Sequence, residues 1–319
     1  MSIAAKVKVI MPDSGLTQSR PLWYGLVRRF LCSSPPSPMA HADILARLVA
    51  LRDEIRRHDY LYYVKARPEI SDSRYDGLFR ELIELEQAYP ELVTADSPSQ
   101  RVGAPPLEEL VKVLHAQPML SLDSIVDQSE VQAFDQRMKR ELETQFVEYS
   151  AEPKFDGLSV ELIYDHGTFT RGATRGDGAT GEDVTVNLRT IRSLPLHLQP
   201  QSNHPDHLVV RGEVYMRLDD FQALNRRMTE RGSDAFANPR NAASGSLRQL
   251  DSTMTATRPL VVTCYEIMTA STAAPPTHWD ELEQLAQWGL PVPTHRRICT
   301  SIDEVVAFHH ETESVRDQL

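Results

Sequence analysis

The feature of the sequence that most constrains the fold is a change in the spacing of its apolar residues near residue 108. Before that point, Ile44, Leu48, Leu51 and Ile55 recur every three or four positions, which is the period of one helix face. After it, short runs alternate between apolar and polar residues, as β-strands do. The chain is therefore predicted to fold as a helical part followed by a part that contains sheets.

A second helix completes the predicted N-terminal domain. It should begin near Ser71 or Asp72, because either side chain can cap the first turn. Pro90 should end it. Its inward face carries Tyr75, Leu78, Phe79, Leu82 and Leu85. We expect this helical domain to span residues 39–108 and to finish in the proline-rich connection DSPSQRVGAPP.

The remaining residues, 109–319, are predicted to form an α+β domain. Asp165, His166 and Gly167 predict a turn between two of its strands. Because few helices separate the central strands, the sheet should be largely antiparallel. The predicted strands are VEYSAEPK, LSVELIYD, FTRGATR, LVVRGEVYM and LVVTCYEIM, and the predicted helices are 219–231, 278–288 and 302–312.

Residues 1–38 differ from the rest, and we expect an unrelated or disordered extension. They are basic, contain one acid at Asp13, and end in SSPPSP before Met39, an alternative start. The segment LWYGLVRRFL would suit the amphipathic helix of a targeting leader, but a clean apolar region and a cleavage site are missing.

Composition narrows the classes of function. No apolar run approaches the roughly 20 residues that cross a bilayer, so we expect no membrane partner. Cys32, Cys264 and Cys299 are too scattered for a zinc site or a disulfide framework, which favours the cytoplasm. The net charge of −11 argues against a simple basic DNA-coating protein. Residues 166–260 nevertheless carry twelve Arg against ten Asp and Glu, a local excess compatible with phosphate contact.

The single lysine in AEPKFDG is a candidate catalytic nucleophile. The chain has six lysines and twenty-eight arginines, and no lysine follows Lys154. An ammonium can lose its proton and become a nucleophile, whereas a guanidinium cannot. On a strand, Glu152 and Asp156 would share a face with Lys154, and Gly157 would let a ligand approach closely. The alternative is a plain row of ion pairs on an exposed strand.

Longer motifs surround this lysine. AEPKFDG is followed in order by RGATRGDGATGEDVTVNLRTI, VVRGEVYM and FANPRNAASGSLRQLD. Together they closely resemble the adenylation domain of bacterial NAD+-dependent DNA ligases. The preceding RRHDYLYYVKARPEISDSRYDGLFRELIELE resembles the small N-terminal domain of that family. The resemblance covers about residues 41–319, and it implies a helical nicotinamide-mononucleotide-binding domain followed by a nucleotidyltransferase domain.

The resemblance implies a reaction at Lys154. Its amine would attack the α-phosphorus of NAD+, release nicotinamide mononucleotide and hold AMP as a phosphoramidate. AMP would then pass to the 5′-phosphate of nicked double-stranded DNA, and the nick would be sealed. Asp156 would be the second catalytic residue, contacting the ribose or assisting the lysine.

Further binding residues follow from the same resemblance. Ser121, Leu122, Glu152 and Arg175 would contact the adenine nucleotide, and Glu213 the ribose or catalytic Mg²⁺ (or Mn²⁺). Arg240 and Arg248 would bind phosphate of the cofactor or of a DNA end, for which planar guanidinium groups are suited. From the residues alone, Glu213 is also compatible with a strand-edge pair to Arg211, and RGDGATGED with a plain turn.

The second predicted helix carries a candidate nicotinamide site. Asp72, Tyr75 and Asp76 lie at i, i+3 and i+4, on one face. Two carboxylates and an aromatic ring suit the cationic nicotinamide ring, and Tyr62 would add a second aromatic surface. The resemblance implies that these residues select NAD+. Alternatively, Tyr75 belongs to the apolar stripe and Asp72 is only a helix cap.

The resemblance also implies that the nucleotidyltransferase domain is incomplete. In the family, a strand and a lysine-bearing motif follow the counterpart of Leu319, and then an oligonucleotide-binding barrel, a zinc module and further DNA-binding domains. We therefore expect a fragment that binds the cofactor weakly, self-adenylates poorly and does not seal nicks. A separate chain would have to carry the missing domains, and the missing strand would leave an exposed sheet edge.

Three hypotheses of function follow. The first is an NAD+-dependent DNA ligase, present in part. The second is another lysyl-nucleotidyl transferase, such as an RNA ligase or a capping enzyme, against which the Asp72 and Tyr75 helix argues. The third is a non-catalytic nucleotide-binding protein that keeps the fold without turnover.

Overall fold

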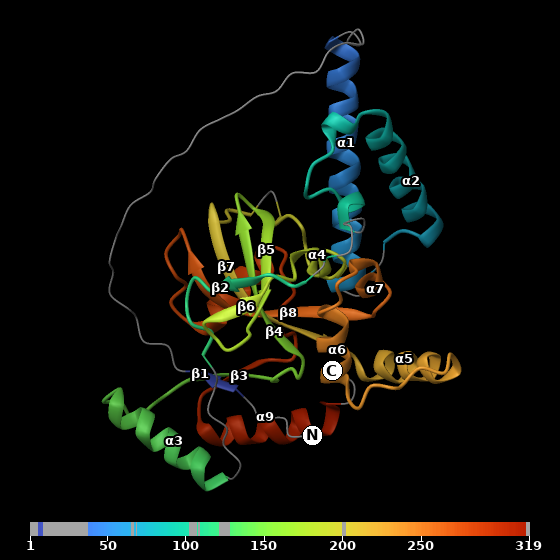
Figure 1. Cartoon of the computed structure of the whole chain (residues 1–319). Helices are drawn as coiled ribbons and strands as arrows, with labels where there is room; N and C mark the ends of the chain where they lie inside the picture. The colour runs from blue at the N-terminus through green and yellow to red at the C-terminus, as the bar shows by residue number, and fades with distance from the viewer. Residues whose placement is uncertain are drawn as a thin grey trace.

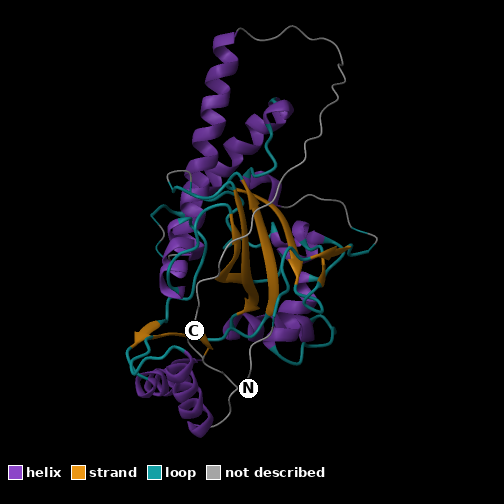
Figure 2. Cartoon of the chain, turned by 90° about the vertical axis from the view of Figure 1, so that its left-hand side faces the viewer, coloured by secondary structure: helices purple, strands orange, loops and turns teal. Residues whose placement is uncertain are grey.

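The structure is a computed structural model that describes residues 6–8, 38–64, 67, 69–101, 107, 109–120, 128–199 and 202–316. Helices α1 and α2 stand at one end of a central antiparallel sheet, and a second group of strands and helices lies at the other end (Figure 1 and Figure 2). The predicted α+β class is confirmed. Among the described helices, none has the length and apolar character that a membrane crossing requires.

The N-terminal helices form where the apolar period predicts them. Helix α1 spans Pro38–Asp59, a short π-helix follows at Tyr60–Val64, and α2 spans Asp72–Ala88. Ser71 caps α2, because its side chain accepts a hydrogen bond from the backbone N–H of Arg74. The two helices bury a small core made of Leu48, Leu51, Ile55, Leu78 and Leu82.

The central sheet has the order β5-β4-β7-β8, and every neighbouring pair is antiparallel. The turn between β4 and β5 is at Asp165, His166 and Gly167, as predicted. His166 and Gly167 have φ of 48° and 77°, the left-handed pair that a tight hairpin requires. The strands are β4 (Leu158–Asp165), β5 (Thr168–Thr174), β7 (His207–Met216) and β8 (Leu260–Ala270).

Two small sheets flank the central one. Strand β3 (Tyr149–Glu152) pairs with β9 (Arg297–Cys299) on one side. On its other side β3 pairs with β1 (Lys6–Lys8), so three residues of the N-terminal extension form a strand rather than an unstructured tail. The rest of residues 1–37 lies outside the described residues. The second small sheet pairs β2 (Lys112–Leu114) with β6 (Thr180–Glu182).

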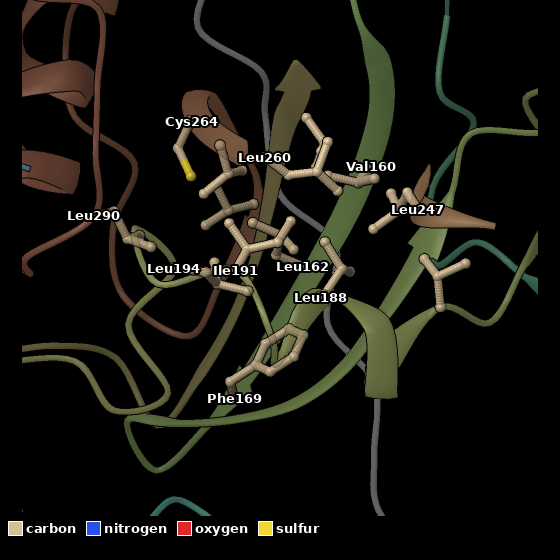
Figure 3. Close-up of a cluster of buried hydrophobic side chains, with 14 of the residues drawn as sticks. Val160, Leu162, Phe169, Leu188, Ile191, Leu194, Leu247, Leu260, Cys264 and Leu290 are labelled. Atoms are coloured by element: carbon tan, nitrogen blue, oxygen red, sulfur yellow. The ribbon is translucent and has the colours of Figure 1, made fainter. Parts of the chain in front are cut away.

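Helices cover the central sheet and close its core. In Figure 3, apolar side chains from β4, β5, β8 and the segments between them converge, with Leu162 and Leu188 fully buried. The three predicted helices form as α5, α8 and α9, within a few residues of the expected bounds. The helices after residue 120 are α3 (Gln128–Glu141), α4 (Thr185–Leu188), α5 (Leu218–Glu230), α6 (Pro239–Leu247), α7 (Ser252–Ala256), α8 (His278–Gln287) and α9 (Ile302–Val315).

A buried arginine joins the helical part to the sheet domain. Arg101 lies at the end of the short helix Pro98–Arg101, which follows the similar turn Pro90–Leu92. Its guanidinium donates to the carbonyls of Arg189, Ile191 and Leu194 at 3.1–3.2 Å, and lies 3.8 Å from Asp59. Burial raises the pKa of Asp59, and Arg101 opposes that effect.

Replacing Leu162 should show how much the central core contributes. Leu162→Ala leaves a cavity inside a close-packed sheet, so we expect a loss of about 2–5 kcal/mol in the free energy of unfolding, measured in urea. Leu114→Ala is the matched control, because Leu114 is 75% exposed, and it should change stability by less than about 0.5 kcal/mol. Equal effects of the two substitutions would contradict this account of the core.

Candidate active site

A cavity of about 770 Å³ opens beside the end of β3, and six of the thirteen predicted site residues line it. Its size suits a nucleotide-sized ligand. Residues far apart in the sequence meet there, from β3, the turn after β5, β7, α6 and α8. The predicted residues on its lining are Glu152, Lys154, Arg175, Glu213, Arg240 and Arg248.

The structure corrects the prediction that Lys154 lies on a strand. Strand β3 ends at Glu152, and residues 153–157 have no regular structure. Phe155 packs on Tyr215 with ring centroids 4.7 Å apart, and Lys154 is exposed on the cavity lining. Glu152 and Lys154 both line the cavity, whereas Asp156 is exposed and is not among the lining residues, so the three side chains do not share one face.

The prediction that Gly157 makes room for a ligand is also wrong. The space that its missing side chain leaves is filled by β7, because a Cβ there would lie 2.0 Å from the carbonyl oxygen of Val214. A ligand is not what approaches this glycine. Its N–H donates to Oε1 of Glu213 at 3.2 Å, which ties the lysine segment to β7. Residue 157 must therefore be a glycine so that the chain can pack against β7, and this contact fixes the point at which β4 begins.

The two predicted phosphate-binding arginines are each held by a carboxylate. Arg240 lies in the first turn of α6, and its Nη1 is 2.8 Å from Oδ1 of Asp156. Arg248 follows the last turn of α6 and makes two bonds to Glu182, at 2.6 and 2.7 Å. The hydrogen bond with Glu182 raises the pKa of Arg248. All four side chains are partly exposed, so a phosphate can compete for the guanidinium groups.

The glycine-rich run RGDGATGED forms a tight turn between β5 and β6. Gly176 and Gly178 have φ of 54° and 97°, which favours glycine. The carboxylate of Asp177 accepts from the N–H groups of Ala179 and Thr180 at 2.9 and 2.7 Å. The N–H groups of Ala179 and Thr180 are therefore hydrogen-bonded within the turn, and the run lines the cavity with Arg175 and with residues of the turn itself.

Glu213 is buried in β7 and faces the cavity. The guanidinium of Arg211 lies 3.6 Å from Glu266 and donates to the carbonyl of Leu120 at 2.7 Å.

Within the described part of the chain, no group of three His, Cys, Asp or Glu side chains is placed to hold a metal ion. Mg²⁺ at nucleotide sites uses one or two carboxylates with the phosphates of the ligand, and Glu213 fits that role.

Among the lining residues that were not predicted, four carry polar groups that interact at the site: Ser159, Arg211, Tyr265 and His278. Ser159 Oγ lies 2.9 Å from the hydroxyl of Tyr265, and the Arg211 guanidinium lies 5.7 Å from the centre of that ring. A tyrosine within the apolar run LVVTCYEIM is only a weak sequence signal for a site residue, because it does not indicate which side chain the tyrosine would contact. The better signal is at 277–281, where a helix-capping Thr is followed by His278 and Glu281, one turn apart.

His278 lies between two carboxylates in the wall of the cavity. Its Nδ1 is 2.7 Å from Glu281 Oε2, and its Nε2 is 3.2 Å from Glu152 Oε1. Burial lowers the pKa of His278, but the hydrogen bonds with Glu152 and Glu281 outweigh it and raise the pKa to about 9. His278 is therefore an imidazolium at neutral pH.

The predicted nicotinamide residues lie apart from this cavity, because Tyr62, Tyr75 and Asp76 are not among its lining residues. Tyr75 is half-buried on α2 and donates through its hydroxyl to Asp59 at 2.8 Å. Asp76 and Tyr62 are exposed, with Tyr62 at 52%. The side chain of Asp72, and the residues Ser121 and Leu122, lie outside the described parts.

Comparison with known families gives two matches. Residues 41–103 match the N-terminal NAD+-binding domain of DNA ligase-like proteins, and residues 107–319 match the NAD-dependent DNA ligase adenylation domain. The chain belongs to the NAD-dependent DNA ligase family. The resemblance seen in the sequence is thus confirmed, and the cavity lies within the part that matches the adenylation domain.

Individual ligases support the assignment. The chain is 50% identical over 289 residues to the DNA ligase of Syntrophobacter fumaroxidans. The aligned region covers 89% of this chain and 42% of that protein. It is 51% identical over 271 residues to the Salinibacter ruber DNA ligase (84% and 39%), and 45% identical over 291 residues to that of Haloferax volcanii (89% and 41%). The chain spans about two-fifths of the length of these curated relatives.

Gly157→Ala should destabilise this ligase-family fold. The new Cβ meets the carbonyl of Val214, so we expect a loss of about 3 kcal/mol in the free energy of unfolding. Gly77→Ala is the matched control. Gly77 lies inside α2 with nothing within 4 Å of a Cβ, and alanine there should stabilise by about 0.5–1 kcal/mol. A neutral Gly157→Ala would show that β7 does not hold the lysine segment.

Stability should depend on pH through His278. Its folded pKa of about 9 exceeds the unfolded value of 6.5, so its contribution is full below about pH 6.5 and is lost as pH rises through about 9. The stability difference between wild type and His278→Gln should therefore fall by about 3 kcal/mol between about pH 6 and pH 9, measured by urea unfolding. A difference that is constant with pH would mean that folding does not raise the pKa of His278.

Proposed function

We propose that this chain binds NAD+ with its adenylate half in the cavity and transfers AMP to Lys154, the first step of DNA ligation. The observation that carries the proposal is the placement of the lysine. Lys154 is exposed at a cavity that also gathers the buried carboxylates Glu152 and Glu213 and four arginines. Such a wall offers acceptors to the base and ribose and cations to the phosphates.

The chemistry follows from the contacts of Asp156. A phosphate that enters the site competes for Arg240 and releases Asp156, which lies two residues from Lys154. The freed carboxylate can then take the proton of the lysine as its nitrogen attacks. The new N–P bond forms as the bond from the α-phosphorus to the pyrophosphate oxygen breaks, and nicotinamide mononucleotide leaves.

The remaining parts of the ligase reaction are proposed on the same basis. Tyr62, Tyr75, Asp72 and Asp76 would receive the nicotinamide half of NAD+ on α2 and the turn before it. Glu213 would contact Mg²⁺ (or Mn²⁺) together with the phosphates, and the ion would supply charge neutralisation there. The substrate of the whole ligase would be nicked double-stranded DNA, with Arg248 at the DNA phosphate.

The match of residues 41–103 to an NAD+-binding domain speaks against the alternative of an RNA ligase or capping enzyme, which uses a nucleoside triphosphate. A non-catalytic nucleotide-binding role makes a different prediction from the proposed one. It requires NAD+ binding in the cavity without any covalent product at Lys154. Intact mass distinguishes the two directly.

Incubating the chain with Mg²⁺ and NAD+ should slowly produce a mass gain of one AMP, read by intact mass spectrometry. ATP should give no adduct. Lys154→Ala and Lys154→Arg should both abolish the gain, because neither side chain supplies an amine nucleophile. Lys139→Ala is the control. Lys139 lies on α3, paired with Asp135, and its removal should leave the adduct unchanged.

Three outcomes would contradict the proposal. An adduct formed from ATP would indicate a different nucleotidyl transferase. An adduct that persists in Lys154→Ala would place the nucleophile elsewhere. NAD+ binding without any adduct would favour the non-catalytic alternative.

A further inference from the structure

A buried chain of three charged groups forms the cavity wall beside Lys154. Glu281, His278 and Glu152 follow one another in space, although Glu152 is 126 residues from His278 in the sequence. Each side chain is more than nine-tenths buried. Glu152 and His278 line the cavity, and Glu281 lies behind them on α8.

The contacts determine which atoms carry protons. Both ring nitrogens of His278 face carboxylate oxygens at hydrogen-bond distance, so both must donate, as only an imidazolium can. Both carboxylate oxygens of Glu281 are hydrogen-bonded, because the second one accepts from the backbone N–H of Ile267. His278 is thus held from behind by Glu281, and it presents one N–H to Glu152.

One oxygen of Glu152 has no partner among the residues that the structure describes. Its Oε1 accepts from His278, whereas its Oε2 is buried without a hydrogen bond. A buried carboxylate oxygen that is left unsatisfied is costly, so such a group in a native protein requires an explanation. Because Glu152 lines the cavity, a ligand donor is the natural partner for Oε2.

We propose that His278 is a positioning residue that makes the site selective for adenine, by holding Glu152 as a fixed, ionised acceptor of the exocyclic amine. This inference rests on the proposed function, since it assumes that the adenylate half of NAD+ occupies the cavity. A hypoxanthine base carries a carbonyl oxygen where adenine carries the amine, and its donor is the neighbouring ring N–H. A fixed carboxylate opposes that carbonyl, while a carboxylate free to shift reaches the ring N–H.

The experiment compares two dinucleotides with the full chain. Isothermal titration calorimetry without Mg²⁺ would measure Kd for NAD+ and for nicotinamide hypoxanthine dinucleotide. Wild type should prefer NAD+ by about tenfold or more, the scale of a hydrogen bond to a charged group. His278→Gln should bring the two Kd values within about threefold. The ratio is taken on one preparation, so an unfolded fraction cancels.

Two further variants keep the test decisive. His295→Gln is the matched control, because His295 lies outside the cavity lining and bonds to Thr312 at 3.0 Å, so the preference for NAD+ should persist. Should His278→Gln fail to fold, Glu281→Gln leaves the histidine in place but removes one of its carboxylates. It should lower the preference in the same direction.

The outcomes separate this inference from the proposed function. A His278→Gln or Glu281→Gln variant that keeps the wild-type ratio would overturn the positioning role. Wild type that binds both dinucleotides equally would overturn the base selectivity while leaving NAD+ binding intact. Wild type that binds neither would overturn the proposed function, and this inference with it.

Discussion

The close contact between Gly157 and strand β7 is the constraint on which the site depends. The backbone of residue 157 approaches the carbonyl of Val214 so closely that no side chain fits between them. Its N–H at the same time donates to Glu213. One packing contact thus fixes the start of β4, the position of a buried carboxylate and the exposure of Lys154. The lysine owes its position to a neighbouring strand that is more than fifty residues away.

Local patterns account for most of the fold, because they report properties that act over a few residues. The helical period predicted α2, Ser71 caps it, and His166 with Gly167 forms the expected hairpin turn. The i±2 argument at Lys154 failed because β3 ends two residues earlier, at Glu152, one residue past its last pair with β9. Strand ends are set by the neighbouring strand, which local spacing does not describe.

The site was predictable only where a motif carried it. Lys154 was singled out by its motif, Glu213, Arg240 and Arg248 were found through family resemblance, and all four converge on one cavity. Spacing could not show that Glu152 is bonded to His278, since the two are joined by tertiary structure alone. Nor could it show that Asp156 holds Arg240. The partner of a charged side chain depends on the tertiary structure, and the spacing of nearby residues in the sequence reveals only part of that structure.

The ion pairs at Arg240 and Arg248 change how this surface meets a polyanion. In the free protein, each guanidinium is already neutralised by Asp156 or Glu182. A phosphate therefore exchanges places with a carboxylate instead of meeting a bare cation. Added salt weakens both the pair that breaks and the pair that forms, so the two effects partly cancel. Binding at these two positions should respond less steeply to ionic strength than two uncompensated arginines would.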